Sequence, residues 1–323
     1  MSTVRYYRHD DVGAPTLTGE VGSLTNLLRK CLVGTAGVAY GSKPSAGWSE
    51  AFAGAASNIA VFRNNAADGG SGAYMRIDDN ASGAGGAREA KLTGYVAMTD
   101  INTGSSATAS PWVRKSQTAD ATARKWLVVA DGLTAWMQVW ENGGAIGLGR
   151  DCSFLGLGDY ACVAPSSAYR YFAMGIEFAN DAFSHIKALQ ASTGPHNNQS
   201  DKGDGLTVPA LDGIAPVVQA SIRHTTRFYG AGAGAVGGTF FPASPHAITG
   251  DTYFERNPVI LQGNVLLGRL RGLVMPYQAI ISAPAGVAYA PLPGTVLVKA
   301  RAMNFTNDEV GAAFLIDTAG PWP

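Results

Sequence analysis

The fold is decided by the segment Arg124-Lys-Trp-Leu-Val-Val-Ala-Asp-Gly-Leu-Thr-Ala-Trp-Met-Gln-Val-Trp-Glu-Asn142. Two runs rich in β-branched and aromatic residues flank Asp131-Gly132, and such runs form strands. An Asp-Gly pair favours a two-residue type I′ turn, because both central residues need positive φ. We therefore predict a β-hairpin that places three indoles, those of Trp126, Trp136 and Trp140, on or near one sheet surface.

Short β-prone segments recur on both sides of this hairpin, separated by loops rich in Gly, Ser, Asn and Asp. They are residues 59–62, 73–77, 94–98, 161–163, 169–178, 217–222, 259–274, 294–302 and 312–317. We expect the last two segments to pair with each other. Strands at this spacing predict a mainly β protein made of sandwich-like or barrel-like modules.

One short helix is predicted near the N-terminus, at residues 23–33. Its apolar residues recur at helical spacing, Ser23 is a suitable N-cap, and Gly34 follows the end. The apolar stripe consists of Leu24, Leu27, Leu28, Cys31 and Leu32. One face of this helix should pack on a sheet.

The length of 323 residues suggests about two domains. The segment 190–213 is polar and rich in Gly, which is typical of a linker or a long exposed loop. We therefore predict an N-terminal β-rich domain over residues 1–189 and a C-terminal β-rich domain over residues 214–323. The sequence leaves open whether the two halves form one continuous sandwich.

The charge of the chain excludes several classes of partner. Lys and Arg number 24, and so do Asp and Glu, so the net charge is zero. This argues against a nucleic-acid-binding protein and against a polybasic membrane patch. No apolar run approaches ~18 residues, so no membrane span is predicted. The N-terminus lacks the apolar region of a signal peptide, so we expect that the protein functions without classical secretion.

Cysteine and histidine spacing predicts neither a disulfide framework nor a metal site. Cys31, Cys152 and Cys162 are an odd count without a CxxC pair. Cys152 and Cys162 could pair, but we expect buried free thiols. No metal-ligand spacing joins the histidines, which are His9, His185, His196, His224 and His246. No cofactor is predicted.

The other candidate motifs are better explained as loops and turns than as cofactor, metal or catalytic sites. The glycine-rich segment 230–238 is not followed by a helix pattern, so a loop is favoured over a dinucleotide site. Asp10-Asp11 and Asp78-Asp79 are adjacent acids, whose side chains on a strand point to opposite faces. We interpret both pairs as turn residues, with a calcium site at residues 78–80 as an alternative. No GxSxG nucleophile motif is present, and we predict that the protein is not an enzyme.

Tryptophans are the remaining candidates for a binding site. Trp112, Trp126, Trp136 and Trp140 could form a platform that stacks sugar rings, because indoles suit pyranose faces and protein interfaces alike. The alternative is that these indoles belong to the core. The site residues predicted for an interface or for glycan stacking are Trp126, Trp136 and Trp140.

The opening segment Tyr7–Leu28 resembles the start of a group of tailed-bacteriophage virion proteins. Further similar segments are Gly47–Phe52, Met75–Asp79, Gly94–Gly104, Asp120–Trp126 and Leu315–Trp322. The resemblance implies a structural protein of the particle, in the tail or its tip. The absence of a signal peptide and of a disulfide framework suits assembly in the host cytoplasm. The low charge suits burial against the expected partners, which are copies of the chain itself and other virion proteins. The resemblance carries no catalytic residues to this chain.

Three functions compete at this point. The first is a structural tail or baseplate subunit, with a capsid decoration (cement) protein as a variant. The second is an adhesin that binds a host-surface glycan. The third is an enzyme such as a depolymerase, which would need two carboxylates ~5–10 Å apart in a groove. Composition and motifs favour the structural subunit.

Overall fold

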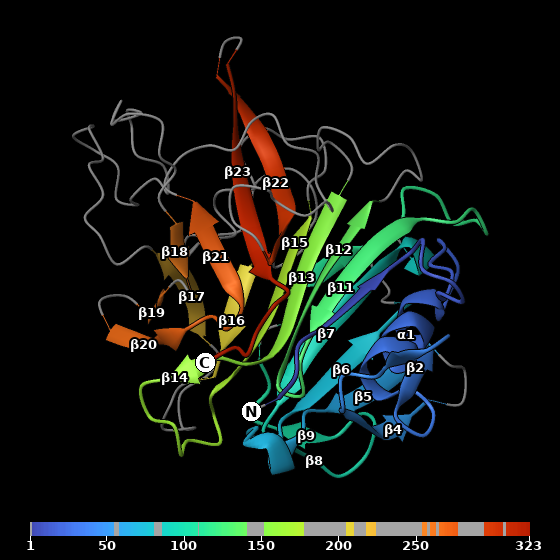
Figure 1. Cartoon of the computed structure of the whole chain (residues 1–323). Helices are drawn as coiled ribbons and strands as arrows, with labels where there is room; N and C mark the ends of the chain where they lie inside the picture. Colours follow the sequence, from blue (N-terminus) through green and yellow to red (C-terminus); the bar gives the residue numbers. More distant parts are fainter. Residues whose placement is uncertain are drawn as a thin grey trace.

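The structure is a computed structural model. It describes residues 2–54, 58–80, 86–108, 110–140, 152–177, 205–209, 218–223, 254–256, 259–262, 265–276, 294–305 and 308–323. Strands greatly outnumber helical segments among these residues, which confirms the mainly β prediction. The described strands form three larger sheets and two short ribbons, and all the pairings among them are antiparallel (Figure 1).

The largest sheet has ten strands and runs through the middle of the molecule. Its order is β1 (Arg5–Arg8), β11 (Lys125–Ala130), β12 (Thr134–Trp140), β13 (Cys152–Asp159), β15 (Tyr171–Glu177), β16 (Gly205–Val208), β17 (Val218–Arg223), β19 (Val259–Gln262), β20 (Val265–Arg269) and β14 (Ala161–Cys162).

Two further sheets flank the central one. The five-stranded sheet has the order β10 (Trp112–Arg114), β7 (Glu89–Tyr95), β6 (Tyr74–Asp78), β5 (Ile59–Arg63) and β4 (Ser49–Ala53). The four-stranded sheet has the order β18 (Phe254–Arg256), β21 (Leu273–Pro276), β23 (Asp308–Asp317) and β22 (Thr295–Phe305). The two ribbons pair β2 (Val38–Tyr40) with β3 (Lys43–Pro44) and β8 (Ala97–Met98) with β9 (Gly104–Ser105).

The predicted hairpin is confirmed as β11 and β12, but the predicted turn is wrong. Neither Asp131 nor Gly132 has a positive φ, which a type I′ turn at this pair would need. The turn centres instead on Gly132-Leu133, because the Asp131 amide donates to the Thr134 carbonyl at 2.9 Å. The Asp131 carboxylate accepts from the amides of Leu133 and Thr134, at 2.9 and 2.8 Å. Asp131 therefore acts through its side chain, as Asp commonly does in turns.

The central strands are buried on both faces, which explains their continuous apolar sequences. Even-numbered residues of β12 face a core shared with the four-stranded sheet, formed by residues that include Trp136, Trp140, Phe172, Leu273, Val296 and Ile316. Odd-numbered residues face a second core, shared with the five-stranded sheet and the helix, formed by residues that include Met137, Val139, Leu27, Phe62 and Ile77. The fold is thus a sandwich of three layers (Figure 1).

The ten-stranded sheet curls at Tyr160. This residue alone separates β13 from β14, although β13 is the fourth strand in the order and β14 is the last. Because adjacent chain segments must stay close, the far end of the sheet bends back toward β13. The buried Tyr160 side chain belongs to the first core. Within the described residues the order stays open, so no closed barrel forms.

The predicted helix is confirmed as α1 (Ser23–Leu28), which continues as the π-helical turn η1 (Arg29–Val33) and ends at Gly34 with φ of +68°. The capping role predicted for Ser23 is wrong: Ser23 is already helical, and its hydroxyl donates to the Thr18 carbonyl. Two single 3₁₀ turns, η2 (Ala66–Asp68) and η3 (Gly86–Arg88), complete the described helical elements. None of the helices in the described ranges is long and apolar enough to cross a membrane.

The second half of the chain is joined to the first by strand pairing. The expected pair at residues 294–302 and 312–317 is confirmed as β22 and β23. Residues 205–208 lie within the predicted linker yet form β16, which pairs with β15 on one side and β17 on the other. The other described residue of that segment is Pro209, and residues 190–204 and 210–213 lie outside the described residues. The division into two domains stays a prediction, while one hydrogen-bonded sheet crosses its boundary.

Candidate functional site

The three tryptophans predicted to share one surface lie on two opposite faces of the central sheet. Trp126 is directly opposite Val139, and residues opposite each other on paired strands share a face. Trp126 therefore belongs to the second core, whereas Trp136 and Trp140 belong to the first. The prediction of one indole surface is wrong.

All three side chains are buried within the single chain. Trp136 stacks on Phe154 with ring centroids 5.5 Å apart, and it packs against Phe172 at 5.2 Å. Its indole N–H donates to the Arg271 carbonyl at 2.8 Å. The Trp126 indole donates to Pro15, and Trp140 is 4% exposed. Rings in this state offer no face to a glycan or a partner, so the interface role predicted for them is corrected to a core role.

Trp112 is the one tryptophan of the six that is not fully buried. It lies on β10, opposite Lys91 of β7, and the Lys91 ammonium is 5.8 Å from the centre of its ring. This distance permits a cation–π interaction. Trp112 was among the candidates for stacking, and it is the one whose ring remains partly accessible.

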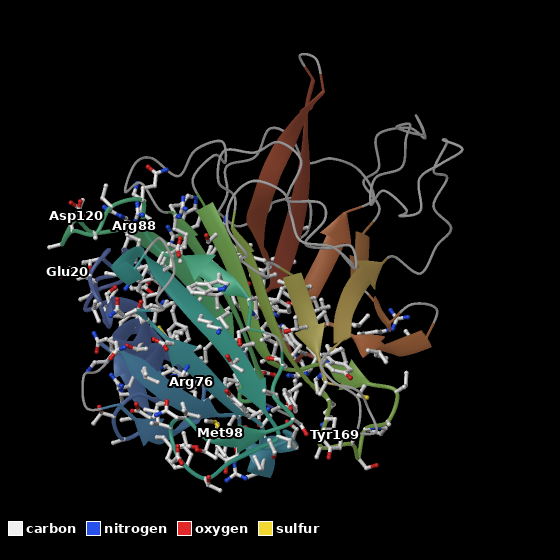
Figure 2. All side chains as sticks on the ribbon, turned by 180° about the vertical axis from the view of Figure 1, so that it is seen from behind. Glu20, Arg76, Arg88, Met98, Asp120 and Tyr169 are labelled. Atoms are coloured by element: carbon white, nitrogen blue, oxygen red, sulfur yellow. The ribbon has the colours of Figure 1, made fainter. Side chains whose placement is uncertain are left out.

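Trp112 belongs to a larger set of partly exposed side chains on the outer face of the five-stranded sheet, which we name the ladder face. Figure 2 views the molecule from this side and labels Arg76. The ladder face consists of Phe52, Arg63, Tyr74, Arg76, Asp78, Lys91, Tyr95, Trp112 and Arg114. The alternating residues of each strand, such as Met75 and Ile77, point into the second core.

One row of the ladder face is aromatic with an arginine in its middle. Tyr74 is directly opposite Arg63 on one neighbouring strand and Tyr95 on the other. The Arg63 guanidinium lies 5.1 Å from the centre of the Tyr74 ring. Phe52, one strand further, stacks on Tyr74 at 6.3 Å between centroids. Four neighbouring strands thus contribute to one aromatic and cationic row.

The remaining charges of the ladder face are partly paired. Arg76 contacts Asp78 at 3.3 Å, and its Nε donates to the Ile101 carbonyl at 2.9 Å. Arg114 contacts the buried Glu89, which lies directly opposite it on β7, at 3.7 Å. Among the described residues Arg63 and Lys91 have no ion-pair partner, and both lie beside aromatic rings. With the buried Glu89 counted, four cations on this side of the sheet meet two carboxylates, and the two cations in excess lie beside Tyr74 and Trp112.

The acidic pairs singled out in the sequence are neutralised within the chain. Asp10 contacts Arg8 at 2.8 Å and Asp11 contacts Lys43 at 2.5 Å. Asp78 contacts Arg76, and the buried Asp79 contacts Lys115. These carboxylates are therefore occupied by cations of the chain, which argues against the alternative of a calcium site at residues 78–80.

The described residues contain no metal-ligand cluster. No group of three or more His, Cys, Asp or Glu side chains is placed there to hold a metal ion. His9 is half-buried, and burial lowers the pKa of its imidazole. The other four histidines and the glycine-rich segment 230–238 lie outside the described residues.

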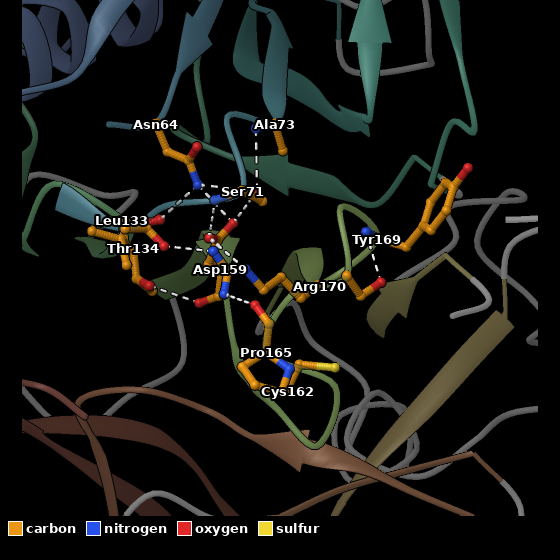
Figure 3. Close-up of polar contacts among 12 residues, drawn as sticks. Asn64, Ser71, Ala73, Leu133, Thr134, Asp159, Cys162, Pro165, Tyr169 and Arg170 are labelled. Carbon is orange, nitrogen blue, oxygen red and sulfur yellow. Dashed lines mark hydrogen bonds and ion pairs between the residues drawn. The ribbon is translucent and has the colours of Figure 1, made fainter. Parts of the chain in front are cut away.

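A second polar cluster surrounds Asp159 (Figure 3). Its carboxylate accepts from Asn64 Nδ2 at 2.6 Å and from the Ser71 hydroxyl and amide at 2.5 and 2.6 Å. Arg170 Nε lies 3.6 Å away. Burial raises the pKa of the Asp159 carboxyl, although these donors oppose the effect. Both carboxylate oxygens are fully engaged, so this cluster holds the Asn64–Ser71 loop against the end of β13.

Sequence patterns identified Trp112 but missed the aromatic row. The sequence pattern that indicates this row is Tyr74-Met-Arg-Ile-Asp78, in which apolar residues alternate with polar or amphipathic ones. Such alternation predicts a strand with one face left for solvent or a partner. No protein-family model, no curated protein and no solved structure matches this chain.

Proposed function

We propose that the chain is a structural subunit of a tailed-phage particle, in the tail or baseplate, which assembles with copies of itself and with other virion proteins. The observation that carries this proposal is the ladder face. Tyr, Trp, Phe and Arg are the residues enriched in the central parts of protein interfaces. Here two tyrosines, one tryptophan, one phenylalanine and three arginines share one sheet face.

Geometry also favours a contact surface of this kind. Residues on a sheet are held by backbone hydrogen bonds, so their backbone loses little freedom when a partner binds. Tyr74 and Trp112 are fixed further by the adjacent Arg63 and Lys91. The partners expected from the sequence resemblance are proteins, and a rigid aromatic face suits a protein partner.

Composition supports repeated burial against neighbours. Charged residues are 15% of the chain, below the ~25% of ordinary soluble domains. Freely diffusing monomers usually carry more surface charge, which keeps them soluble. A subunit whose surface is covered by neighbouring proteins needs less surface charge to stay soluble.

Self-assembly is tested by measuring the molar mass of the purified full chain by light scattering across a concentration series. We expect a mass above the 33.5 kDa of one chain, and a shift toward 33.5 kDa in Tyr74→Ser. Val12→Ser is the control, because Val12 is 92% exposed but lies outside the ladder face. A wild-type chain that stays at 33.5 kDa at every concentration argues against self-assembly.

Location is tested by labelling purified phage particles with antibodies against the chain. We expect label at the tail or its tip. Label over the capsid would instead favour the decoration (cement) protein, and particles without label would contradict the proposal.

A second candidate, a glycan-binding adhesin, is favoured by Trp112 alone. Its partly accessible indole beside the Lys91 ammonium could stack a sugar ring and contact an acidic group. Trp112→Ala should then abolish adsorption to host cells while the tail assembles normally. Unchanged adsorption would remove this candidate.

A further inference from the structure

Asp79 and Lys115 form the most deeply buried pair of opposite charges in the described structure. Both side chains are 0% exposed, and Lys115 Nζ contacts Asp79 Oδ1. Asp79 directly follows β6, and Lys115 directly follows β10. Neither residue belongs to the ladder face, and the proposed function gives neither a role.

The carboxylate of Asp79 has two different surroundings. Oδ2 accepts hydrogen bonds from the Leu24 and Thr25 amides, at 2.8 and 3.4 Å. Oδ1 contacts Lys115 Nζ, yet no hydrogen bond with standard geometry reaches this oxygen. The two amides thus polarise the carboxyl group from one side while the amine lies against the other.

Lys115 is held in position by groups that fix its amine. Nζ donates to the Ser23 hydroxyl at 3.1 Å and to the Glu20 carbonyl. These acceptors leave a lone pair of the neutral amine free to face Asp79. The amine and the carboxyl group are therefore oriented before any reaction, which is the arrangement that accelerates an intramolecular step.

Burial acts on both partners in the direction of neutrality. It raises the pKa of Asp79 to about 6, although the Lys115 charge and the two amides oppose this shift. It also lowers the pKa of Lys115, although Asp79 opposes that shift. Transfer of one proton from the ammonium to the carboxylate gives an amine and a carboxylic acid, the pair that can condense.

We propose that Asp79 and Lys115 are joined by an intramolecular isopeptide bond. The lone pair of Lys115 Nζ attacks Asp79 Cγ, and the amides of Leu24 and Thr25 stabilise the charge that develops on Oδ2. A new N–C bond forms, the bond from Cγ to the Oδ1 hydroxyl breaks, and that hydroxyl leaves with an amine proton as one water molecule. The dry site favours loss of water and excludes the reverse hydrolysis.

The bond would tie the end of β6 to the end of β10 and hold both against the start of α1. These strands lie on either side of β7 in the five-stranded sheet. The cross-link closes the chain between residues 79 and 115, so it restricts the unfolded state in the way that a disulfide does. This inference is independent of the proposed phage role.

The test is the intact mass of the purified full chain after denaturation. We expect a mass lower than that of the sequence by one water molecule. Lys115→Arg keeps the positive charge but cannot form this amide, and it should have its full sequence mass. Lys91→Arg is the matched control on the neighbouring strand and should retain the loss of water. A wild-type chain with its full sequence mass overturns the proposal, whether or not Lys115→Arg folds.

Trypsin digestion locates the bond. Cleavage after Arg76, Arg88, Arg114 and Arg124 should release one branched peptide, in which residues 77–88 are joined to residues 115–124. A succinimide at Asp79 would give the same mass loss in the linear peptide 77–88, and that result would also overturn the proposal.

Discussion

Arg271 and Asp131 form a bidentate ion pair across 140 positions of the sequence. Arg271 Nη1 lies 3.1 Å from Asp131 Oδ1, and Nη2 lies 2.7 Å from Oδ2. Both residues are buried. The same guanidinium donates to the carbonyls of Trp322 and Pro323, at 3.2 and 2.7 Å. The turn of the central hairpin is thereby fastened to the C-terminus, near the N-terminus (Figure 1).

Replacing this arginine should destabilise the whole protein. Arg271→Met leaves the Asp131 carboxylate buried without its cation, and breaking a buried pair in this way costs about 3–5 kcal/mol. Arg269→Met is the control, because Arg269 is exposed and surface charges contribute about 0–1 kcal/mol. Urea unfolding followed by circular dichroism measures both. Equal effects of the two substitutions would contradict the role assigned to the buried pair.

Gly272 should not tolerate a side chain. Its φ is +74°, and a Cβ at this position would lie 2.2 Å from Cε2 of Trp322. Gly272→Ala should therefore lower the free energy of unfolding by the penalty of left-handed backbone, about 1–2 kcal/mol, and by a further overpacking penalty of about 1–3 kcal/mol. Gly69→Ala carries the backbone penalty alone, because Gly69 has φ of +93° with open space around it. If the two substitutions destabilise equally, the contact with Trp322 is not tight.

The hairpin shows how far sequence patterns predict this fold. The apolar runs on either side of Asp131-Gly132 fix the two strands, since β-branched and aromatic residues suit paired, buried strands. The composition of the two runs does not show which side chains share a face, because that depends on the strand register. Trp126 is opposite Val139, and side chains alternate along a strand, so Trp126 cannot share a face with Trp136.

Contacts between distant segments could not be predicted at all. The amides of Leu24 and Thr25 are bound by Asp79, which lies 55 and 54 residues away, rather than by a neighbouring side chain. Local patterns describe the helix but not which strand end meets it. The ladder face can be predicted in part. The alternation of apolar and polar residues in β6 is present in the sequence, but the alignment of Tyr74 with Arg63 and Tyr95 depends on strand order.

The two classes of tryptophan should differ in their contribution to stability. Trp136→Ala removes a ring packed between Phe154 and Phe172 and should cost about 3–5 kcal/mol. Trp112→Ala removes a partly exposed ring and should cost about 1 kcal/mol. Thermal and urea unfolding of both variants measure the difference. A larger loss for Trp112→Ala would contradict the assignment of Trp136 to the core.

The described cysteines should differ in reactivity. Cys31 is fully buried in the second core, and burial raises the pKa of its thiol well above the ordinary value. Because the thiolate is the reactive form, Cys31 should react with an aromatic disulfide reagent only after unfolding. Cys162 is half-buried and free, so it should react in the folded protein. The measurement uses the Cys152→Ser variant, which leaves these two thiols. Equal reaction rates of Cys31 and Cys162 in the folded state would contradict the prediction.

Asp159 should make the stability of the protein fall as pH rises through mildly acidic values. Burial raises the pKa of its carboxyl above the ordinary 3.8, so in that interval the native state binds more protons than the unfolded state. The free energy of unfolding then declines with increasing pH, from 3.8 up to the raised pKa, and no further above it. Asp159→Asn cannot ionise and should lack this decline, although it loses part of the hydrogen bonding to Ser71 and Asn64. Urea unfolding of both proteins between pH 4 and 7 gives the comparison. A difference that is constant with pH would mean that folding does not raise the pKa of Asp159. A difference that increasingly favours the wild type as pH rises would mean that the donors stabilise the carboxylate more than burial disfavours it.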